Sequence, residues 1–183
     1  MAVIAERGFA AATMAEIAAR AGAPIGSLYR FFPGKEVLAD ALAQRFSERL
    51  GEIFEDIRRR EPTVEELADA LLSLMGNLRN ERLAARALLE AHPEWRERGK
   101  FRQVMTGQIA QTLRSCCPGL PEDESGIAAI ALLHVMKAAG ALSDGTLSER
   151  RAAAELREMA RIYLEGMFQR FPAKVLSRKR RNQ

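Results

Sequence analysis

The chain has 183 residues, of which 48% are hydrophobic and 28% charged, a composition typical of a globular protein with one sizeable core or with a small domain beside a larger one. Charged residues are interspersed with alanine and leucine, and the lack of alternating runs rich in valine or threonine argues against a β-sheet protein and favours an all-α fold. Net charge does not indicate nucleic-acid binding, because five basic residues lie in the last ten positions, and the rest of the chain holds 23 basic against 24 acidic residues.

The basic tail comprises residues 174–183. We expect a solvated terminus there, with contact to phosphates as the alternative. Its basic residues are Lys174, Arg178, Lys179, Arg180 and Arg181.

Membrane, metal and cofactor functions find no support in the sequence. No hydrophobic run approaches the roughly 18 residues that cross a membrane, and no secretory leader opens the chain. The two cysteines, Cys116 and Cys117, are adjacent, a spacing that rarely allows a disulfide or a metal site. We therefore expect a cytoplasmic protein with reduced thiols and with neither a metal nor a cofactor.

In chain order, the first predicted element is the end of a helix, for which Gly8 is a plausible C-cap. Thr13 and Glu16 then have the T-x-x-E spacing of a capping box, so a helix of about two turns begins near Met14. Gly22 ends this helix. Its apolar stripe consists of Met14, Ile17, Ala18 and Ala21.

A second short helix follows after a tight turn. Pro24 suits its first position, and Pro33 with Gly34 stops it. Two short helices joined by a tight turn that contains glycine form a helix-turn-helix, whose second helix can lie in the major groove of DNA.

The rest of the chain reads as further helices, which gives about nine in all. A second capping box, Thr63 with Glu66, starts one of them, and Ser148 is the expected N-cap of the last. The expected domains are 1–45, with the helix-turn-helix, and 46–183. The expected helices after the helix-turn-helix are 35–58, 63–80, 82–91, 94–116, 122–142 and 149–171.

The segment GFAAATMAEIAARAGAPIGSLYRFFPGKEVL, from Gly8 to Leu38, resembles the DNA-binding domain of the TetR family of bacterial transcription regulators. It covers about the first quarter of the chain, and the rest agrees with the family only in the number and order of helices. The resemblance implies a small helix-turn-helix domain and a larger carboxy-terminal helical domain. The matching residues are Gly8, Phe9, Thr13, Ile17, Ala18, Ala21, Gly22, Gly26, Leu28, Tyr29, Phe32, Lys35 and Leu38.

The resemblance also implies DNA contacts. Tyr29 would bond a phosphate and fix the register on the duplex, and Lys35 and Thr13 would contact further phosphates. Arg30 would join them or face solvent, and Pro24 lies at the start of the recognition helix. The residues expected at base edges are Ile25, Gly26 and Ser27, among which Ile25 could meet a thymine methyl group.

Core packing is the competing interpretation of the aromatic cluster Tyr29, Phe31 and Phe32. We accept it for Phe32, which lies four residues after Leu28, so that both should pack on the preceding helix. Tyr29 lies off that stripe.

In the family, the middle helices enclose a small-molecule pocket, and effector binding there lowers the affinity for DNA. The residue types of this chain would suit an apolar or aromatic effector, with plain core packing as the alternative for each residue. The candidate lining residues are Met75, Leu78, Leu88, His92, Trp95, Phe101, Met105, Ile109 and His134.

The last two helices, expected at about 122–142 and 149–171, are predicted to form a homodimer. The first of them is dense in small residues that let another helix approach closely, and the second has a broad apolar stripe that ends at Phe171. A two-fold dimer would bind a palindromic operator. The small residues are Ala128, Ala131, Ala138, Ala139, Gly140 and Ala141.

Two other function classes compete with a repressor. An enzyme is disfavoured, because His92 and His134 lie in no catalytic motif and neither Ser115 nor Cys116 has a visible base partner. The second alternative is a helical ligand- or protein-binding dimer with an impaired DNA-binding domain. It arises because family members usually begin many residues earlier, with a basic arm, so that either the true start lies upstream or the domain is weakened.

Overall fold

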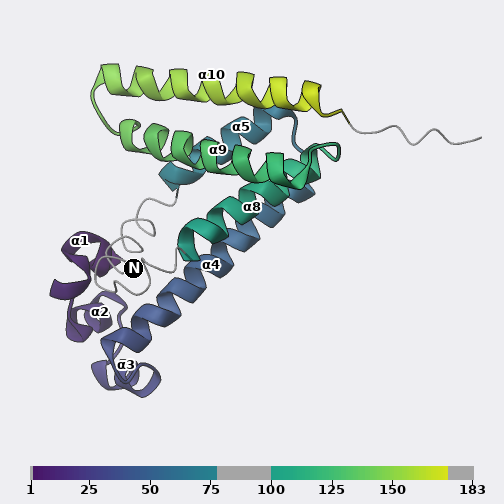
Figure 1. Ribbon diagram of the computed structural model, residues 1–183. Helices are drawn as coiled ribbons and strands as arrows, with labels where there is room; N and C mark the ends of the chain where they lie inside the picture. Colours follow the sequence, from purple (N-terminus) through teal and green to yellow (C-terminus); the bar gives the residue numbers. More distant parts are fainter. Residues whose placement is uncertain (1, 78–99, 173–183) are drawn as a thin grey trace, which may run out of the picture. The chain divides into compact units, whose positions relative to one another are not determined.

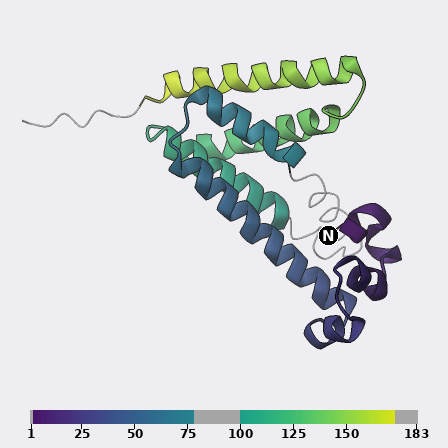
Figure 2. The same cartoon turned by 180° about the vertical axis from the view of Figure 1, so that it is seen from behind.

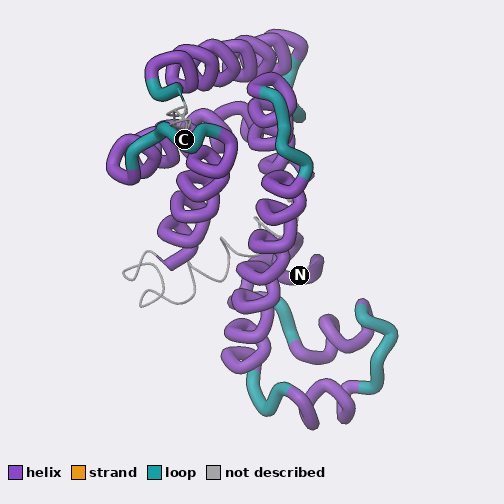
Figure 3. Tube along the Cα trace, turned by 90° about the vertical axis from the view of Figure 1, so that its right-hand side faces the viewer, coloured by secondary structure: helices purple, strands orange, loops and turns teal. Residues whose placement is uncertain are grey.

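The computed structural model describes residues 2–77 and 100–172, and every regular element in these ranges is an α-helix (Figure 1, Figure 3). The expected all-α fold is therefore confirmed. The ranges contain eight helices, and the helix expected at 82–91 lies outside them. The helices are α1 (Ala2–Ala11), α2 (Met14–Arg20), α3 (Ile25–Phe31), α4 (Lys35–Arg59), α5 (Val64–Asn77), α8 (Lys100–Cys116), α9 (Glu122–Leu142) and α10 (Leu147–Arg170).

Contacts divide the chain into two compact units. The first combines Met1–Glu55 with Ser73–Met105, and the second combines Asp56–Leu72 with Thr106–Gln183. Helices α4, α5 and α8 therefore each contribute to both units. The division of function at residues 45 and 46 remains a prediction.

A small apolar core holds α1, α2 and the start of α4 together. Ile4 is 1% exposed, and Ala39 of α4 is fully buried. Ile17 of α2 and Leu42 of α4 pack against this core, and α3 packs on α2 in turn. Figure 2 shows the three short helices, in purple, gathered at the start of α4. The buried members of the core are Val3, Ile4, Phe9, Ala12 and Ala39.

Two glycines shape the helix ends of the first unit. Gly22 has φ +65°, and its N–H donates to Ala19 O at 3.1 Å while Ala23 N–H donates to Ala18 O at 3.0 Å. This pair of bonds is a Schellman motif, which confirms the predicted end of α2. Gly8, with φ 78° and ψ 163°, interrupts α1, a backbone conformation that residues with a Cβ rarely adopt.

The centre of the second unit is the antiparallel pair α9 and α10 (Figure 1). Helix α9 buries one side, which is rich in alanine and leucine, and α10 packs against it through one stripe. Two polar bonds join further helices of this unit: Arg114 of α8 donates to the fully buried Ser125 hydroxyl of α9 at 2.9 Å, and Arg58 of α4 donates to Thr112 Oγ1 of α8 at 3.2 Å. The buried residues of α10 are Ala153, Ala160, Leu164 and Met167.

The N-cap of the last helix was predicted wrongly. Helix α10 begins at Leu147, and its N-cap is Thr146 rather than Ser148. Thr146 N–H donates to the Glu149 carboxylate at 2.6 Å, and Glu149 N–H donates to Thr146 Oγ1 at 3.3 Å. This capping box satisfies two backbone N–H groups, whereas a lone serine cap satisfies one.

The expectation that no segment is long and apolar enough to cross a membrane is also wrong, when length and composition alone are considered. Helix α9 passes that test over an 18-residue window, of which 44% is buried. The core helix of a soluble protein passes the same test, and one such helix is weak support for a membrane span.

The revised cap gives a direct prediction. Replacing Thr146 with Ala should lower the free energy of unfolding by about 1 kcal/mol, because an N-cap hydroxyl and its reciprocal bond are lost. Ser148→Ala is the matched control and should change it by less than about 0.5 kcal/mol, as expected for exposed positions. Urea unfolding of both variants measures the difference, and equal losses would show that the cap is assigned incorrectly.

Candidate nucleic-acid interface

Helix α3 begins one residue later than the sequence suggested. Pro24 was expected at the first helical position, but it is the N-cap, with φ −59° and ψ 137°. Its backbone is still extended, and its carbonyl accepts the first bonds of the helix from Ser27 N–H at 3.0 Å and Leu28 N–H at 3.3 Å. The turn between α2 and α3 is therefore short, as a helix-turn-helix requires.

No residue of α3 is fully buried. Tyr29 is 48% exposed, Ile25 45% and Phe31 73%. Leu28 and Phe32 are half-buried, which agrees with their expected packing on the inner side. The predicted separation of Tyr29 from the core stripe is therefore confirmed.

The outer face of α3, as we name it, consists of Gly26, Ser27, Arg30 and Phe31. Gly26 and Arg30 lie opposite Leu28 at 100° per residue, Ser27 lies at about a right angle to it, and Phe31 lies about 60° from it; all four are exposed. The face presents the Arg30 guanidinium, the Ser27 hydroxyl and the Phe31 ring, and at Gly26 the backbone has no side chain. Such a set can contact phosphate, a base edge and an apolar base or sugar surface.

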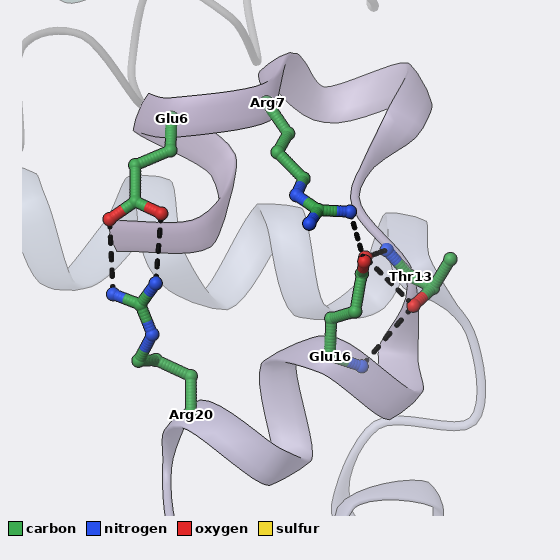
Figure 4. Close-up of polar contacts among 5 residues, drawn as sticks. All are labelled: Glu6, Arg7, Thr13, Glu16 and Arg20. Atoms are coloured by element: carbon green, nitrogen blue, oxygen red, sulfur yellow. Dashed lines mark hydrogen bonds and ion pairs between the residues drawn. The ribbon is translucent and has the colours of Figure 1, made fainter.

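The start of α2 is fixed by a capping box that also binds α1 (Figure 4). Thr13 N–H donates to Glu16 Oε2 at 3.0 Å, and Glu16 N–H donates to Thr13 Oγ1 at 3.2 Å. The guanidinium of Arg7 on α1 pairs with the same carboxylate. Bonds from Thr13, with a smaller effect of Arg7, lower the pKa of Glu16. The predicted capping box is therefore confirmed.

A second ion pair joins the end of α2 to the residue next to Arg7 on α1. Arg20 at the end of α2 donates to both carboxylate oxygens of Glu6 on α1, at 3.0 and 2.8 Å (Figure 4). The hydrogen bonds and charge of Arg20 lower the pKa of Glu6. A bidentate contact fixes orientation as well as distance, so the two pairs set the position of α2 on α1.

Lys35, an expected phosphate ligand, binds within its own unit. Its Nζ donates to Ala10 O at 2.9 Å and lies 4.6 Å from the centre of the Phe9 ring. These contacts satisfy a carbonyl at the end of α1 and add a cation–π interaction. The ammonium retains donors for a phosphate, and that contact remains a prediction.

The expected effector residues fall into four groups. Met75, Met105 and Ile109 are buried, whereas His134 is exposed on α9. Phe101 belongs to α8, and nothing is described of its side chain. The four others, Leu78, Leu88, His92 and Trp95, lie outside the described ranges.

The chemistry of the remaining side chains offers little for catalysis. Burial raises the pKa of Cys116 and of Cys117, and the Cys117 thiol donates to Phe171 O at 3.0 Å. Raised pKa values keep thiols protonated and unreactive. In the part of the chain that the structure describes, no group of three His, Cys, Asp or Glu side chains is placed to hold a metal ion.

Sequence reasoning missed two features of this interface. The exposure of Phe31 could not have been found from helical spacing, because Phe31 lies three residues after Leu28 and thus toward the same side of the helix. The ion pair between Glu6 and Arg20 could not have been predicted either, because the two residues are 14 positions apart on different helices and no local sequence pattern indicates the pairing.

Comparison with known proteins supports a nucleic-acid interface. Residues 1–42 match the model of the family described as bacterial regulatory proteins, tetR family. The match includes α1, α2, α3 and the first residues of α4. A search of curated proteins gives no significant match.

The ion pairs predict an acid-sensitive first unit. Because folding lowers the pKa of Glu6 from 4.5, its stabilising effect is complete above that value and is lost as the pH falls through the lower folded-state pKa. Glu6→Gln should therefore reduce the free energy of unfolding at pH 7 and reduce it less at pH 3. Both side chains are exposed, so 1 M salt should shrink the effect.

The control for this measurement is Asp40→Asn, since Asp40 is exposed on α4 and forms no ion pair with any residue that the structure describes. Urea unfolding between pH 3 and pH 7 compares the variants. An effect of Glu6→Gln that did not depend on pH, or that matched the control, would contradict an electrostatic role for this pair.

Proposed function

Residues 1–42 match the TetR family, and from this premise we propose that the chain, a DNA-binding transcriptional regulator, is a repressor. It binds a palindromic operator as a homodimer, and a small-molecule effector releases it from the DNA. Its place of action is the cytoplasm, and we assign it no catalytic role. The observation that carries the proposal is the outer face of α3. That face is exposed, while the opposite side of the helix packs on α2.

The proposed DNA contacts divide into positioning and reading. Tyr29 and Arg30 bind phosphates and fix the register, and the backbone N–H groups at the helix starts of Thr13 and Lys35 contact further phosphates. Ile25, Gly26 and Ser27 read base edges. The support for this division is the exposure of all these residues except Lys35, which is half-buried, and the family match, which spans all of them.

Support for the dimer comes from two exposed stripes in the second unit. On α9 the stripe repeats at helical spacing and includes Ile127, 64% exposed, and Ile130, 43% exposed. On α10 it includes Met159, 61% exposed, and Ile162, 56% exposed. Adjacent apolar stripes on an antiparallel helix pair are suited to a two-fold four-helix bundle. The exposed stripe residues are Ile127, Ile130, Ala131, His134 and Ala138 on α9, and Ala152, Met159, Ile162, Tyr163 and Gly166 on α10.

The proposed effector site is supported only by the chemical character of the residues expected to line it. Met75, Met105 and Ile109 supply polarisable and aliphatic surface of the kind that lines apolar pockets, and they belong to the helix region that binds effectors in the family. An apolar or aromatic compound is the proposed class. His134 is better assigned to the dimer stripe, since it lies between exposed apolar residues of α9.

Selection from a random duplex library tests the proposal. The full chain at low salt should enrich a palindromic sequence, and Tyr29→Phe should weaken binding to it about tenfold or more, because a hydrogen bond to a charged phosphate is lost in each subunit. The control is Ser148→Ala, which removes an exposed hydroxyl from the first turn of α10, outside the stripe residues given above, and which should bind as the unchanged protein does.

Introducing a charged residue into the exposed stripe of α10 tests, in the same binding assay, whether the protein binds as a dimer. Ile162→Glu should give a monomer by analytical ultracentrifugation and should abolish high-affinity binding to the palindrome, because only one half-site is then engaged. Enrichment of no sequence at all would overturn the proposal in favour of a ligand- or protein-binding dimer. Enrichment of a sequence without two-fold symmetry would overturn the dimeric part alone.

A further inference from the structure

The matched domain carries no excess of positive charge. Residues 1–42 contain four basic side chains, Arg7, Arg20, Arg30 and Lys35, against the four acidic side chains Glu6, Glu16, Glu36 and Asp40. Proteins that hold DNA chiefly through phosphates carry a basic surface, and the release of counterions makes their affinity fall steeply with salt. This domain has no such surplus.

Three of the four cations are engaged within the domain. Arg7 pairs with Glu16, Arg20 forms a bidentate pair with Glu6, and Lys35 donates to Ala10 O above the Phe9 ring. These contacts fix α1, α2 and the start of α4. An arginine that left its carboxylate for a phosphate would exchange one ionic contact for another, and Lys35 would give up its carbonyl and ring contacts. Either change would loosen the helix-turn-helix.

Arg30 differs from the other three. It is exposed on the outer face of α3, and it forms no hydrogen bond or ion pair with the residues that the structure describes. Among the four cations of residues 1–42 it is therefore the one that can approach a phosphate without cost to the fold.

The same face carries an unusually exposed aromatic ring. Phe31 is 73% exposed, more than any other large hydrophobic residue in the described ranges. Ser27 lies one helical turn before it, on the same side. A phenyl ring has no donor for phosphate, so its contribution to a complex is burial against apolar surface, such as a deoxyribose or a thymine methyl group.

We propose that this domain holds its operator with one free cation per subunit, Arg30, and with apolar burial of Phe31, so that binding depends only weakly on salt. The inference rests on the proposed function and specifies the physical nature of the contact. With about 0.9 counterion released per neutralised phosphate, a dimer should show a slope of log K against log salt of about −2. Fourfold more salt would then weaken binding about 10- to 20-fold.

The test measures this slope between 50 and 200 mM salt on the selected palindrome, by fluorescence anisotropy. It uses the full chain and a full-length variant whose tail cations are replaced by Gln, which removes any contribution of the tail. Arg30→Gln should bring the slope close to zero, whereas Arg7→Gln, the matched control at a paired arginine, should leave it unchanged. The replaced tail positions are Lys174, Arg178, Lys179, Arg180 and Arg181.

Phe31→Ala separates the apolar part from the charged part. It should weaken binding about tenfold at every salt concentration without changing the slope, because no charge is removed. Circular dichroism should show an unchanged helix content, since the ring is exposed in the free protein.

Each outcome decides the inference. A slope steeper than about −4 in the tail variant would overturn it while leaving the proposed function intact. An unchanged slope in Arg30→Gln, or full affinity in Phe31→Ala, would do the same. Absence of any sequence-specific binding at 50 mM salt would overturn both the inference and the proposed function.

Discussion

Packing of α2 and α3 on larger neighbours is the constraint on which the rest of the structure depends. Each of these helices has seven residues, and helices shorter than about 12 residues are marginal in isolation. Ile17 joins α2 to the core formed around Ile4 and Ala39, and α3 packs on α2 in turn. The outer face of α3 is therefore held by contacts that all lie on its opposite side.

This constraint explains how the domain uses its charges. A short helix on a small core can rotate or slide unless its ends are fixed, and the pairs Arg7–Glu16 and Arg20–Glu6 fix both ends of α2 on α1. Exposed pairs add little to stability, but two of them restrict orientation, which an interface requires. The cost is that these guanidinium groups are not available to DNA. Positioning of the recognition helix and long-range attraction of phosphate thus compete for the same few cations.

Much of the fold could be predicted from sequence because its signals are local. The capping box of Thr13 and Glu16 and the helix end at Gly22 each depend on residues within a few positions, and both are confirmed. The N-cap of α10 failed for a related reason: Thr146 and Ser148 are both good caps, and only the bond with Glu149 decides between them. The candidate interface was predicted through the family resemblance, and the exposure of Tyr29 agrees with it. The Glu6–Arg20 pair and the contact of Lys35 with Ala10 were not predictable, since they join residues 14 and 25 positions apart.

The most direct test of the account is a crystal structure of the full chain bound to its selected palindrome. The account predicts that α3 lies in the major groove, with Ser27, Arg30 and Phe31 toward the DNA, and that Arg20 remains paired with Glu6. A complex in which another element enters the groove, or in which Arg20 leaves Glu6 to bind a phosphate, would contradict it.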